Sequence, residues 1–261
     1  MKVAFVTGAA GDIGRDICSA FLSKGVSVAG IDRDVARLLV LADAMERDAS
    51  GGARFLPVHA DVTSTESVRA AVETVTSKLG DIQILVNNAG GITKPSLLTT
   101  EEQDWLQDID LNLNGPWRCI HALQPTFVRQ RSGVIVNIAS VNGLQIFGHP
   151  GYSAAKAGLI HLSRFCAMEL GKFGVRSIAI CPGSVKTRIW QERQASNPEI
   201  FRELASWYPS RDICTPKDVA ALVALAADDQ MRLMNGAVIT LDGGLTAGSD
   251  RFASLFTGEA L

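Results

Sequence analysis

Short apolar runs rich in Val and Ile recur at regular intervals along the chain. Runs that are continuously apolar, rather than alternating, are typical of strands covered on both faces, as in a parallel sheet. We therefore expect seven strands, at residues 3–6, 26–31, 55–58, 82–86, 134–138, 175–180 and 238–241.

Between these runs, apolar residues recur at the spacing of one helix face. The clearest cases are Ile13, Ile17, Ala20 and Phe21, then Val68, Val72, Val75 and Leu79, and then Val219, Leu222, Val223 and Ala226. Strands that alternate with helices predict an α/β fold, here a Rossmann-type doubly wound parallel sheet with helices on both faces. Because no change in composition marks a second unit, we expect residues 1–261 to form a single domain.

The segment 188–211 interrupts this alternation after the sixth strand and carries Trp190, Trp207 and Tyr208. Insertions at the carboxyl ends of strands commonly cover a ligand crevice. We expect this segment to cover the substrate, and a surface helical hairpin is the alternative. For the C-terminal tail, residues 250–261, packing on a neighbouring subunit is one interpretation.

The composition is that of a globular protein, with 47% hydrophobic and 20% charged residues in a chain of 261. A net charge of −2 with scattered Lys and Arg gives no electrostatic reason to expect nucleic acid or a membrane surface as a partner. The sequence shows neither a membrane-spanning apolar stretch nor a signal peptide. We therefore expect a cytoplasmic protein with a small-molecule substrate.

The five cysteines and four histidines are dispersed, without the spacing of a metal site. The cysteines form no C-x-x-C pair and are odd in number, so we expect neither a disulfide framework nor bound metal. Most of them are expected to be small core residues in a reducing compartment.

The stretch TGAAGDIG, residues 7–14, joins the first expected strand to the first expected helix. Backbone N–H groups at such a helix start bind pyrophosphate, and glycines let a cofactor approach the backbone. The dinucleotide fingerprint G-x-G-x-x-G is partly matched, because Gly11 and Gly14 fill its last two places while Ala9 fills its first. A glycine-rich connection without a ligand is the alternative.

The second expected strand ends at Asp32, 18 residues after Gly14. An acid at about this distance binds the adenosine ribose hydroxyls and repels a 2′-phosphate, so we expect NAD rather than NADP as the cofactor. Arg33 is the competing signal, since an arginine there could hold the phosphate. Because Asp32 and Asp34 flank it, we expect Arg33 to form an ion pair or to face solvent.

Four more motifs follow at the ends of expected strands or on helices: NNAG at residues 87–90, NIAS ending at Ser140, YSAAK at residues 152–156 and PGSVKT at residues 182–187. Each is weak alone. Together with residues 7–14, and in this order, they resemble the short-chain dehydrogenase/reductase family over nearly the whole chain, from Lys2 to about Gly248. The resemblance implies an oxidoreductase, and a homotetramer assembled through long helices at about residues 101–130 and 151–172.

The resemblance also implies the catalytic residues. Tyr152 is the expected general acid/base. Lys156, four residues later on the same helix face, is expected to lower the pKa of Tyr152 together with oxidised nicotinamide. Ser140 is expected to hold the substrate oxygen, and Asn112 to anchor a water beside the lysine. Asn114, close by, does not match and is interpreted as local structure.

The cofactor contacts are inferred in the same way. Thr187 is expected to bond the nicotinamide amide, and Asp61 to bind the adenine or, alternatively, to cap a helix that starts near Ser64. The full expected set is Gly8, Gly11, Asp12, Ile13, Gly14, Asp32, Arg33, Asp61, Val62, Asn88, Ala89, Gly90, Tyr152, Lys156, Pro182, Gly183, Val185 and Thr187.

The glycine spacing of the turn raises a choice between two branches of this family. The classical branch usually shows T-G-x-x-x-G-x-G, whereas T-G-x-x-G-x-x-G is the spacing of the extended branch, which has a further substrate domain. The chain has no room for that domain, so it is identified as classical with one departure, Asp12. We expect Asp12 to turn outward, cap the first helix and pair with Arg15, and Gly11 to supply backbone freedom.

Polar and aromatic residues near Ser140 and Tyr152 bear on the substrate. Asn142, Gln145 and His149 are polar groups near Ser140 and Tyr152, and the aromatic residues Trp190, Trp207 and Phe147 could cover a ligand. Each of these could instead serve packing. Polar donors with aromatic walls favour oxidation of a secondary alcohol in a polyol, sugar or hydroxy acid. The alternatives are a 3-oxoacyl-thioester reductase and a dinucleotide-sensing protein without catalysis.

Overall fold

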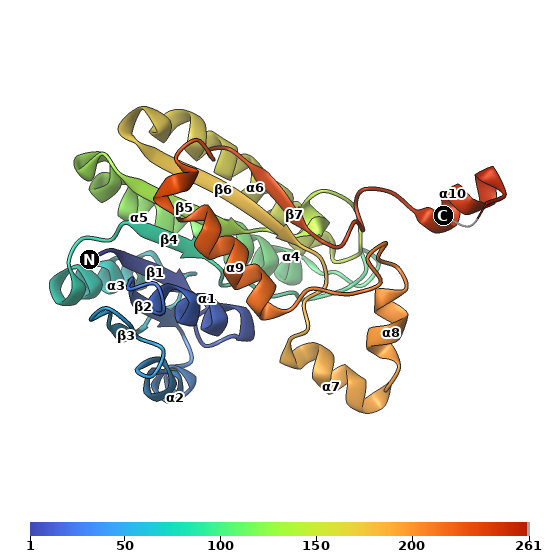
Figure 1. Ribbon diagram of the computed structural model, residues 1–261, viewed down its shortest axis with the longest axis horizontal. Coiled ribbons are helices and arrows are strands. Elements are labelled where there is room, and N and C mark those ends of the chain that lie inside the picture. Colours follow the sequence, from blue (N-terminus) through green and yellow to red (C-terminus); the bar gives the residue numbers. More distant parts are fainter. Residues whose placement is uncertain (260–261) are drawn as a thin grey trace.

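Within residues 1–259, which the computed structural model describes, seven parallel strands form one sheet in the order β3-β2-β1-β4-β5-β6-β7 (Figure 1). All seven expected strands are present, and the predicted fold class is confirmed. The strands are β1 (Val3–Thr7), β2 (Ser27–Asp32), β3 (Phe55–His59), β4 (Ile84–Asn87), β5 (Gly133–Ile138), β6 (Val175–Pro182) and β7 (Val238–Leu241).

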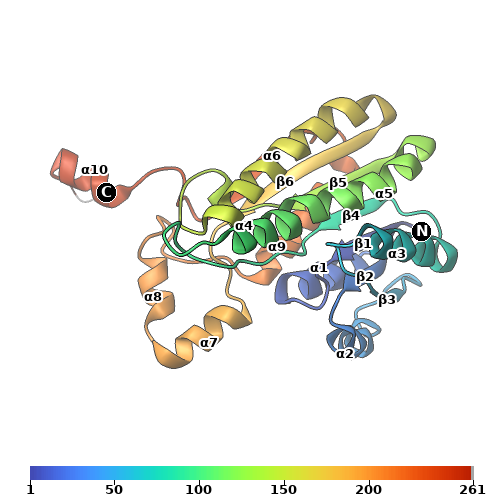
Figure 2. The same cartoon turned by 180° about the vertical axis from the view of Figure 1, so that it is seen from behind.

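Helices cover both faces of the sheet, as the opposite views in Figures 1 and 2 show. One face carries α1 (Asp12–Leu22), α2 (Val35–Met45) and α9 (Pro216–Ala226). The other carries α3 (Thr65–Leu79), α5 (Gly115–Gln130) and α6 (Pro150–Leu170). Short 3-10 turns complete the layers at Val141–Gly143, Gly171–Phe173 and Asp229–Met231.

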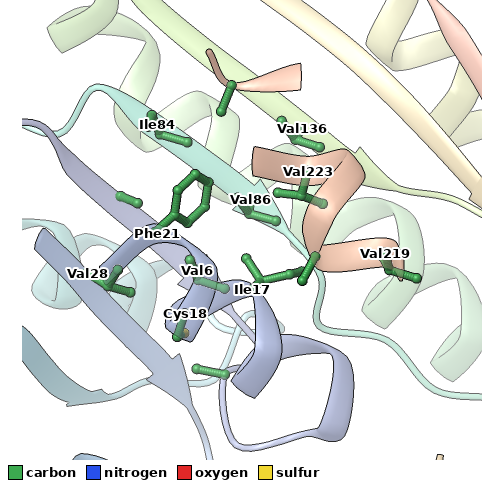
Figure 3. Close-up of a cluster of buried hydrophobic side chains, with 14 of the residues drawn as sticks. Val6, Ile17, Cys18, Phe21, Val28, Ile84, Val86, Val136, Val219 and Val223 are labelled. Atoms are coloured by element: carbon green, nitrogen blue, oxygen red, sulfur yellow. The ribbon is translucent and has the colours of Figure 1, made fainter. Parts of the chain in front are cut away.

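Strand β1 shows why the strands are apolar at every position. Ala4 and Val6 point into the core under α1 and α9, whereas Val3 and Phe5 point into the core under α3 and α5. Because side chains alternate between the two faces of a strand, a strand covered on both sides must be apolar throughout. Figure 3 shows the first of these cores, where α1 and α9 pack on β1, β2, β4 and β5.

The long helix expected at residues 101–130 is broken. It consists of α4 (Glu102–Ile109), a π-helical turn (Asp110–Asn114) and α5. The side chain of Asn112 donates to the carbonyl of Asp108, one turn earlier, and to the carbonyl of Gly91, outside the helix. These bonds stabilise a widened turn, and such turns often mark functional sites.

The segment 188–211 forms two short helices, α7 (Arg188–Ser196) and α8 (Ile200–Ala205), which stand out from the body of the molecule (Figures 1 and 2). Neither contains a buried residue. Farther along, α10 (Asp250–Thr257) lies at the end of an extended connection, away from the sheet. The last two residues of the expected C-terminal tail lie outside the described part of the chain.

Four of the five cysteines are buried, as expected for core residues, and all five are free thiols. Among the residues that the structure describes, no helix is long and apolar enough to cross a membrane. The same residues contain no cluster of three or more side chains suited to hold a metal ion.

Candidate active site

The sheet order reverses between β1 and β4, and the turns after these two strands are tied together. The hydroxyl of Thr7 accepts the backbone N–H groups of Asn88 and Ala89, each at 3.0 Å. The Asn88 amide donates in turn to the carbonyls of Thr7 and Gly8. Ligands of open α/β sheets bind at such a reversal. Thr7 was not among the expected site residues, although it opens the Thr-Gly motif.

Close packing requires two glycines of the first turn. Gly8 has a φ of 66°, and a Cβ on it would lie 2.8 Å from the Cα of Ala89. A Cβ on Gly14 would lie 2.1 Å from the carbonyl oxygen of Gly8, so any side chain there would push α1 away from the turn. Gly11 has a φ of −79° and only an ordinary contact at 3.4 Å. The expectation that Gly11 supplies special backbone freedom is therefore wrong.

Two hollows of about 470 and 880 Å³ adjoin at this reversal, because Gly8, Asp32, Ala89 and Gly90 line both. Most of the expected cofactor residues lie along them. Those lining one or both hollows are Gly8, Gly11, Asp12, Ile13, Gly14, Asp32, Arg33, Asp61, Val62, Asn88, Ala89, Gly90 and Thr187.

Five expected cofactor residues line neither hollow: Tyr152 and Lys156, which lie on α6, and three residues at or after the end of β6. Pro182 ends β6, Val185 forms a bridge with Cys214, and a Cβ on Gly183 would lie 2.9 Å from the ring of Tyr208. These residues direct the chain from the end of β6 to Thr187 at the larger hollow.

Asp32, in the wall shared by the two hollows, accepts the backbone N–H groups of Ala10 and Asp34, each at 3.0 Å. Arg33 was expected either to form an ion pair or to face solvent. In the structure it is exposed to solvent, and it pairs with neither Asp32 nor Asp34. The reason is that Asp34 pairs with Arg37 at 3.3 Å. Arg33 therefore presents its charge to the smaller hollow.

Asp61 does not cap α3, because Ser64 does so by accepting the N–H of Ser67. The Asp61 carboxylate instead accepts the backbone N–H and the hydroxyl of Thr63 at 2.9 and 2.7 Å. Burial alone would raise the pKa of Asp61, but the bonds from Thr63 and the charges of Arg33 and His59 outweigh it. The pKa of Asp61 is therefore lowered, and the residue is an anion in the smaller hollow.

Three of the four expected catalytic side chains come from α6 and from the turn that follows β5. Ser140, just beyond β5, accepts the N–H of Asn142 at 3.1 Å and begins a 3-10 turn. Helix α6 starts at Pro150, a favoured first residue, so Tyr152 lies in its first turn and Lys156 one turn later. The Lys156 Nζ lies 5.5 Å from the centre of the Tyr152 ring and donates to the carbonyl of Ile138 at 2.8 Å.

The pKa of Tyr152 shifts in the direction opposite to the expected one. Burial raises it, the hydrogen bond with Ser140 lowers it, and the negative charge of Asp108, together with that of Cys181 once its thiol ionises, raises it further. The charge of Lys156 does not reverse this, because its ammonium is directed at the Ile138 carbonyl. Burial also lowers the pKa of Lys156 to about 8. The expected decrease in the pKa of Tyr152 depended in part on the positive charge of oxidised nicotinamide, which is not one of these protein groups.

Asn112 is fully buried and bonds both polar atoms of the Gly91 backbone, accepting its N–H at 3.2 Å and donating to its carbonyl at 2.9 Å. A Cβ on Gly90 would lie 2.9 Å from the Asn112 Oδ1 and 3.6 Å from the Lys156 Nζ. Asn112 and Lys156 therefore flank the same glycine. Asn114 bonds Asp110, as local structure.

Asp108 is a site residue that the sequence reasoning missed. It is 2% exposed, accepts the Thr93 hydroxyl at 2.9 Å, and lies against the start of α6, where a Cβ on Gly151 would be 3.0 Å from its carboxylate. The negative charge of Asp108 raises the pKa of Tyr152. The available signal was its position four residues before Asn112, which places both on one helix face.

The expected substrate residues mostly bond neighbouring loops. Asn142 donates to the Gly148 carbonyl and the Ser153 hydroxyl at 3.1 and 3.2 Å. Gln145 donates to the carbonyl of Thr246 at 3.2 Å. Their amide groups thus order the loop after Ser140.

His149 has a φ of 57° and caps α6 in a left-handed conformation. Its ring Nδ1 lies 3.1 Å from the carbonyl of Lys94, which joins the two loops beside Tyr152. Trp190 lies on α7 under the Arg193 guanidinium, 4.7 Å away. Phe147 and Trp207 are exposed. These aromatic side chains remain candidates for contact with a substrate.

The expectation for Asp12 is partly wrong. Asp12 does lie in the first turn of α1, as expected, but it does not cap this helix, because Gly11 is the N-cap. It also does not pair with Arg15, which pairs with Asp16 instead. The Asp12 carboxylate accepts the backbone N–H of Arg188 at 2.7 Å. It therefore connects the first turn to α7.

Comparisons with known proteins agree with this geometry. A family model described as enoyl-(acyl carrier protein) reductase matches residues 8–246. An uncharacterized oxidoreductase of Schizosaccharomyces pombe is 35% identical over 249 residues, covering 95% of this chain and 92% of that protein. A 3-oxoacyl-(acyl-carrier-protein) reductase of Thermotoga maritima is 36% identical over 250 residues, covering 94% and 97%.

Among solved structures, an oxidoreductase of the short chain dehydrogenase/reductase family from Burkholderia thailandensis superposes with a TM-score of 0.91. It is 38% identical, and the match covers 99% of this chain and 98% of that one.

Proposed function

Since the chain belongs to the short-chain dehydrogenase/reductase family, we propose that it uses NAD to interconvert a secondary alcohol and a ketone in a polyol, sugar or small hydroxy acid. The observation that carries the choice of NAD is the Asp32 carboxylate in the wall shared by both hollows. Two like charges about 4 Å apart repel by roughly 4 kcal/mol at an effective dielectric constant of 20. A 2′-phosphate beside Asp32 would meet that repulsion.

The first turn suits a dinucleotide. Gly11, the N-cap of α1, has no side chain with which to satisfy the free N–H groups at the helix start. Those groups face the larger hollow and are donors suited to a pyrophosphate. Asp32 and Asp61 would hold the adenosine half, and Thr187 the nicotinamide half. When bound, the cofactor supplies or accepts the hydride.

The proton is handled by the chain's own residues. Tyr152 gives its phenolic proton to the substrate oxygen in reduction and takes it back in oxidation. Ser140 holds the same oxygen, and Lys156 places a positive charge beside the phenol below about pH 8. Because burial raises the pKa of Tyr152, reduction is favoured at neutral pH, and oxidation speeds up as the pH rises.

A 3-oxoacyl-thioester reductase is the second candidate, favoured by the Thermotoga maritima relative. An enzyme that receives an acidic carrier protein needs free cations at the mouth of its site. Here Arg188, Arg202 and Arg211 lie against Glu192, Glu199 and Asp250, in that order. Three of the four arginines of the segment 188–211 are thus paired with acids, and the fourth, Arg193, stacks on Trp190; this favours a small hydroxylated substrate.

The test is a panel assay that follows the absorbance of the reduced cofactor. Polyols, sugars and hydroxy acids are offered with NAD and with NADP, and a 3-oxoacyl thioester is offered with NADH and with NADPH. We expect oxidation of at least one alcohol, with kcat/KM for NAD at least about tenfold above that for NADP. Efficient reduction of the thioester with NADPH, and no alcohol oxidation, would instead support the second candidate.

For the assembly, we infer a homotetramer in the cytoplasm. Support comes from exposed apolar side chains on α4, α5 and α6, the helices that the family resemblance assigns to subunit contacts. They are Trp105, Leu106, Trp117, Phe165 and Met168.

A further inference from the structure

Asp12 links two parts of the chain that are far apart in sequence. Its carboxylate accepts the backbone N–H of Arg188 at 2.7 Å across 176 residues. Asp12 belongs to the first turn of α1, at the cofactor cleft, whereas Arg188 is the first residue of α7. Asp12, Thr187 and Arg188 line the same hollow.

Among the described residues, the only buried side chain of the segment 188–211 lies at its far end. There Tyr208 is 3% exposed, its hydroxyl accepts the N–H of Ser184 at 2.8 Å, and its ring packs against Gly183. By contrast, α7 and α8 contain no buried residue. Within the described chain, Asp12 is the only side chain outside residues 187–211 that hydrogen-bonds to α7.

The hydrogen bond between Asp12 and Arg188 is suited to stabilise the start of α7. The N-cap of α7, Thr187, has no side-chain bond to the first-turn N–H groups. A carboxylate that accepts such an N–H group caps the helix, and its negative charge favours the positive helix end. Asp12 therefore serves α7 as a cap supplied by another element.

We propose that Asp12 is a positioning residue that fastens the substrate-covering segment 188–211 to the cofactor turn. The bond holds Thr187, the expected partner of the nicotinamide amide, and Ile189 at the cleft, and Trp190 is the next residue of α7. This proposal rests on the function proposed above, and it gives Asp12 a role in the binding of the alcohol substrate. It also explains how an acid is tolerated in a turn suited to phosphate, because its charge is directed at the α7 helix start.

The direct test is amide hydrogen exchange across residues 189–196, which needs no activity. Asp12→Ala removes the acceptor. Arg188→Pro removes the donor; proline suits a first helical position, and Thr187 is extended (φ −102°, ψ 170°), as a residue before proline should be. Arg188→Ala is the matched control, because it loses the same side chain but keeps the N–H.

We expect Asp12→Ala and Arg188→Pro to speed exchange in α7 by about tenfold or more, and the double variant to be no faster than either single one. Arg188→Ala and Asp16→Ala should leave exchange close to that of the parent protein, and Asp12→Asn, which keeps an acceptor oxygen, should partly restore it. Unchanged exchange in both test variants, or an equal effect of Arg188→Ala, would overturn the proposal.

Kinetics separate this role from cofactor binding. We expect Asp12→Ala to raise KM for the alcohol by about tenfold while Kd for NAD, from direct titration, stays within a few-fold. A large loss of NAD affinity with unchanged α7 exchange would mean that Asp12 is a cofactor ligand and would overturn the proposal. If no alcohol is oxidised at all, the proposed function fails, and the exchange data still decide whether Asp12 fastens α7.

Discussion

The ammonium group of Lys156 is buried, and burial disfavours its charged form. Lys156 is 4% exposed and has one hydrogen bond, to the Ile138 carbonyl, and its pKa falls from 10.5 to about 8. A shift of this size corresponds to ~3 kcal/mol of cost in the folded state at neutral pH. Since the folded pKa is depressed, the cost is fully present below about pH 8 and is relieved as the pH rises toward 10.5.

Lys156→Met should therefore abolish activity and raise the free energy of unfolding at pH 7 by about 1–2 kcal/mol, the lost bond to Ile138 offsetting part of the gain. Urea unfolding of both proteins at pH 7 and at pH 9.5 measures this. The advantage of the variant should shrink at the higher pH. A variant less stable than the parent protein at pH 7 would contradict the account of Lys156 as a charge held at a cost.

Asp108 gives a second prediction at the residue scale. The side chains that shift the pKa of Tyr152 are the Ser140 hydroxyl, the carboxylate of Asp108 and the thiol of Cys181. The Lys156 ammonium lies 5.5 Å from the centre of the Tyr152 ring. Removing one negative charge by Asp108→Asn stabilises the phenolate, so the pKa of Tyr152 should fall. The rising limb of the pH profile for alcohol oxidation should move to lower pH.

The matched control for Asp108 is Asp110→Asn, two residues on, where the carboxylate pairs with Arg118 near the surface. Its pH profile should stay in place. Equal shifts in both variants would mean that the effect comes from the net charge of the protein and not from the position of Asp108.

Some of these residues could be predicted and others could not. That Ser140, Tyr152 and Lys156 lie near one another could be predicted, because their motifs are local in sequence. The partner of Asp12 could not be found, because the contact spans 176 residues and involves a backbone N–H that any residue would offer. The direction of the Tyr152 pKa shift depends on burial, which periodicity does not measure.

At the scale of elements, the π-helical turn around Asn112 is the main departure from the prediction. The positions of all seven strands followed from their apolar runs. The family resemblance predicted one long helix at about residues 101–130, and it missed the break because the cause of the break lies elsewhere in the chain. The Asn112 side chain bonds the backbone of Gly91, a tertiary contact with no local signal.

Asn112→Ala should thus leave the buried carbonyl of Asp108 and the half-buried backbone N–H and carbonyl of Gly91 without these partners. We expect a loss of about 2–4 kcal/mol in the free energy of unfolding, along with most of the activity. Asn114→Ala is the control, since its amide bonds only Asp110 at the exposed side of the same turn. Urea unfolding should show a change within about 0.5 kcal/mol for this control, and an equal loss in both variants would contradict the role given to Asn112.

For the whole molecule, the first turn, at the sheet reversal between β1 and β4, and the start of the segment 188–211 line one hollow. The exposed apolar side chains of α4, α5 and α6 do not line the two hollows, and we expect them to pack against a neighbouring subunit. Trp117→Glu with Phe165→Glu should reduce the proposed tetramer to smaller species in light scattering after size exclusion. Val40→Glu on α2, which is 74% exposed, is the control and should remain tetrameric.

The central claim is that Tyr152 transfers a proton in an NAD-dependent oxidation. The most direct measurement is the rate at which the parent protein and Tyr152→Phe form reduced NAD with the best alcohol of the panel. Loss of a general acid/base costs about 10²-fold or more, so we expect the variant to be slower by at least that factor, with NAD affinity retained. A variant that turns over at the rate of the parent protein would contradict the account.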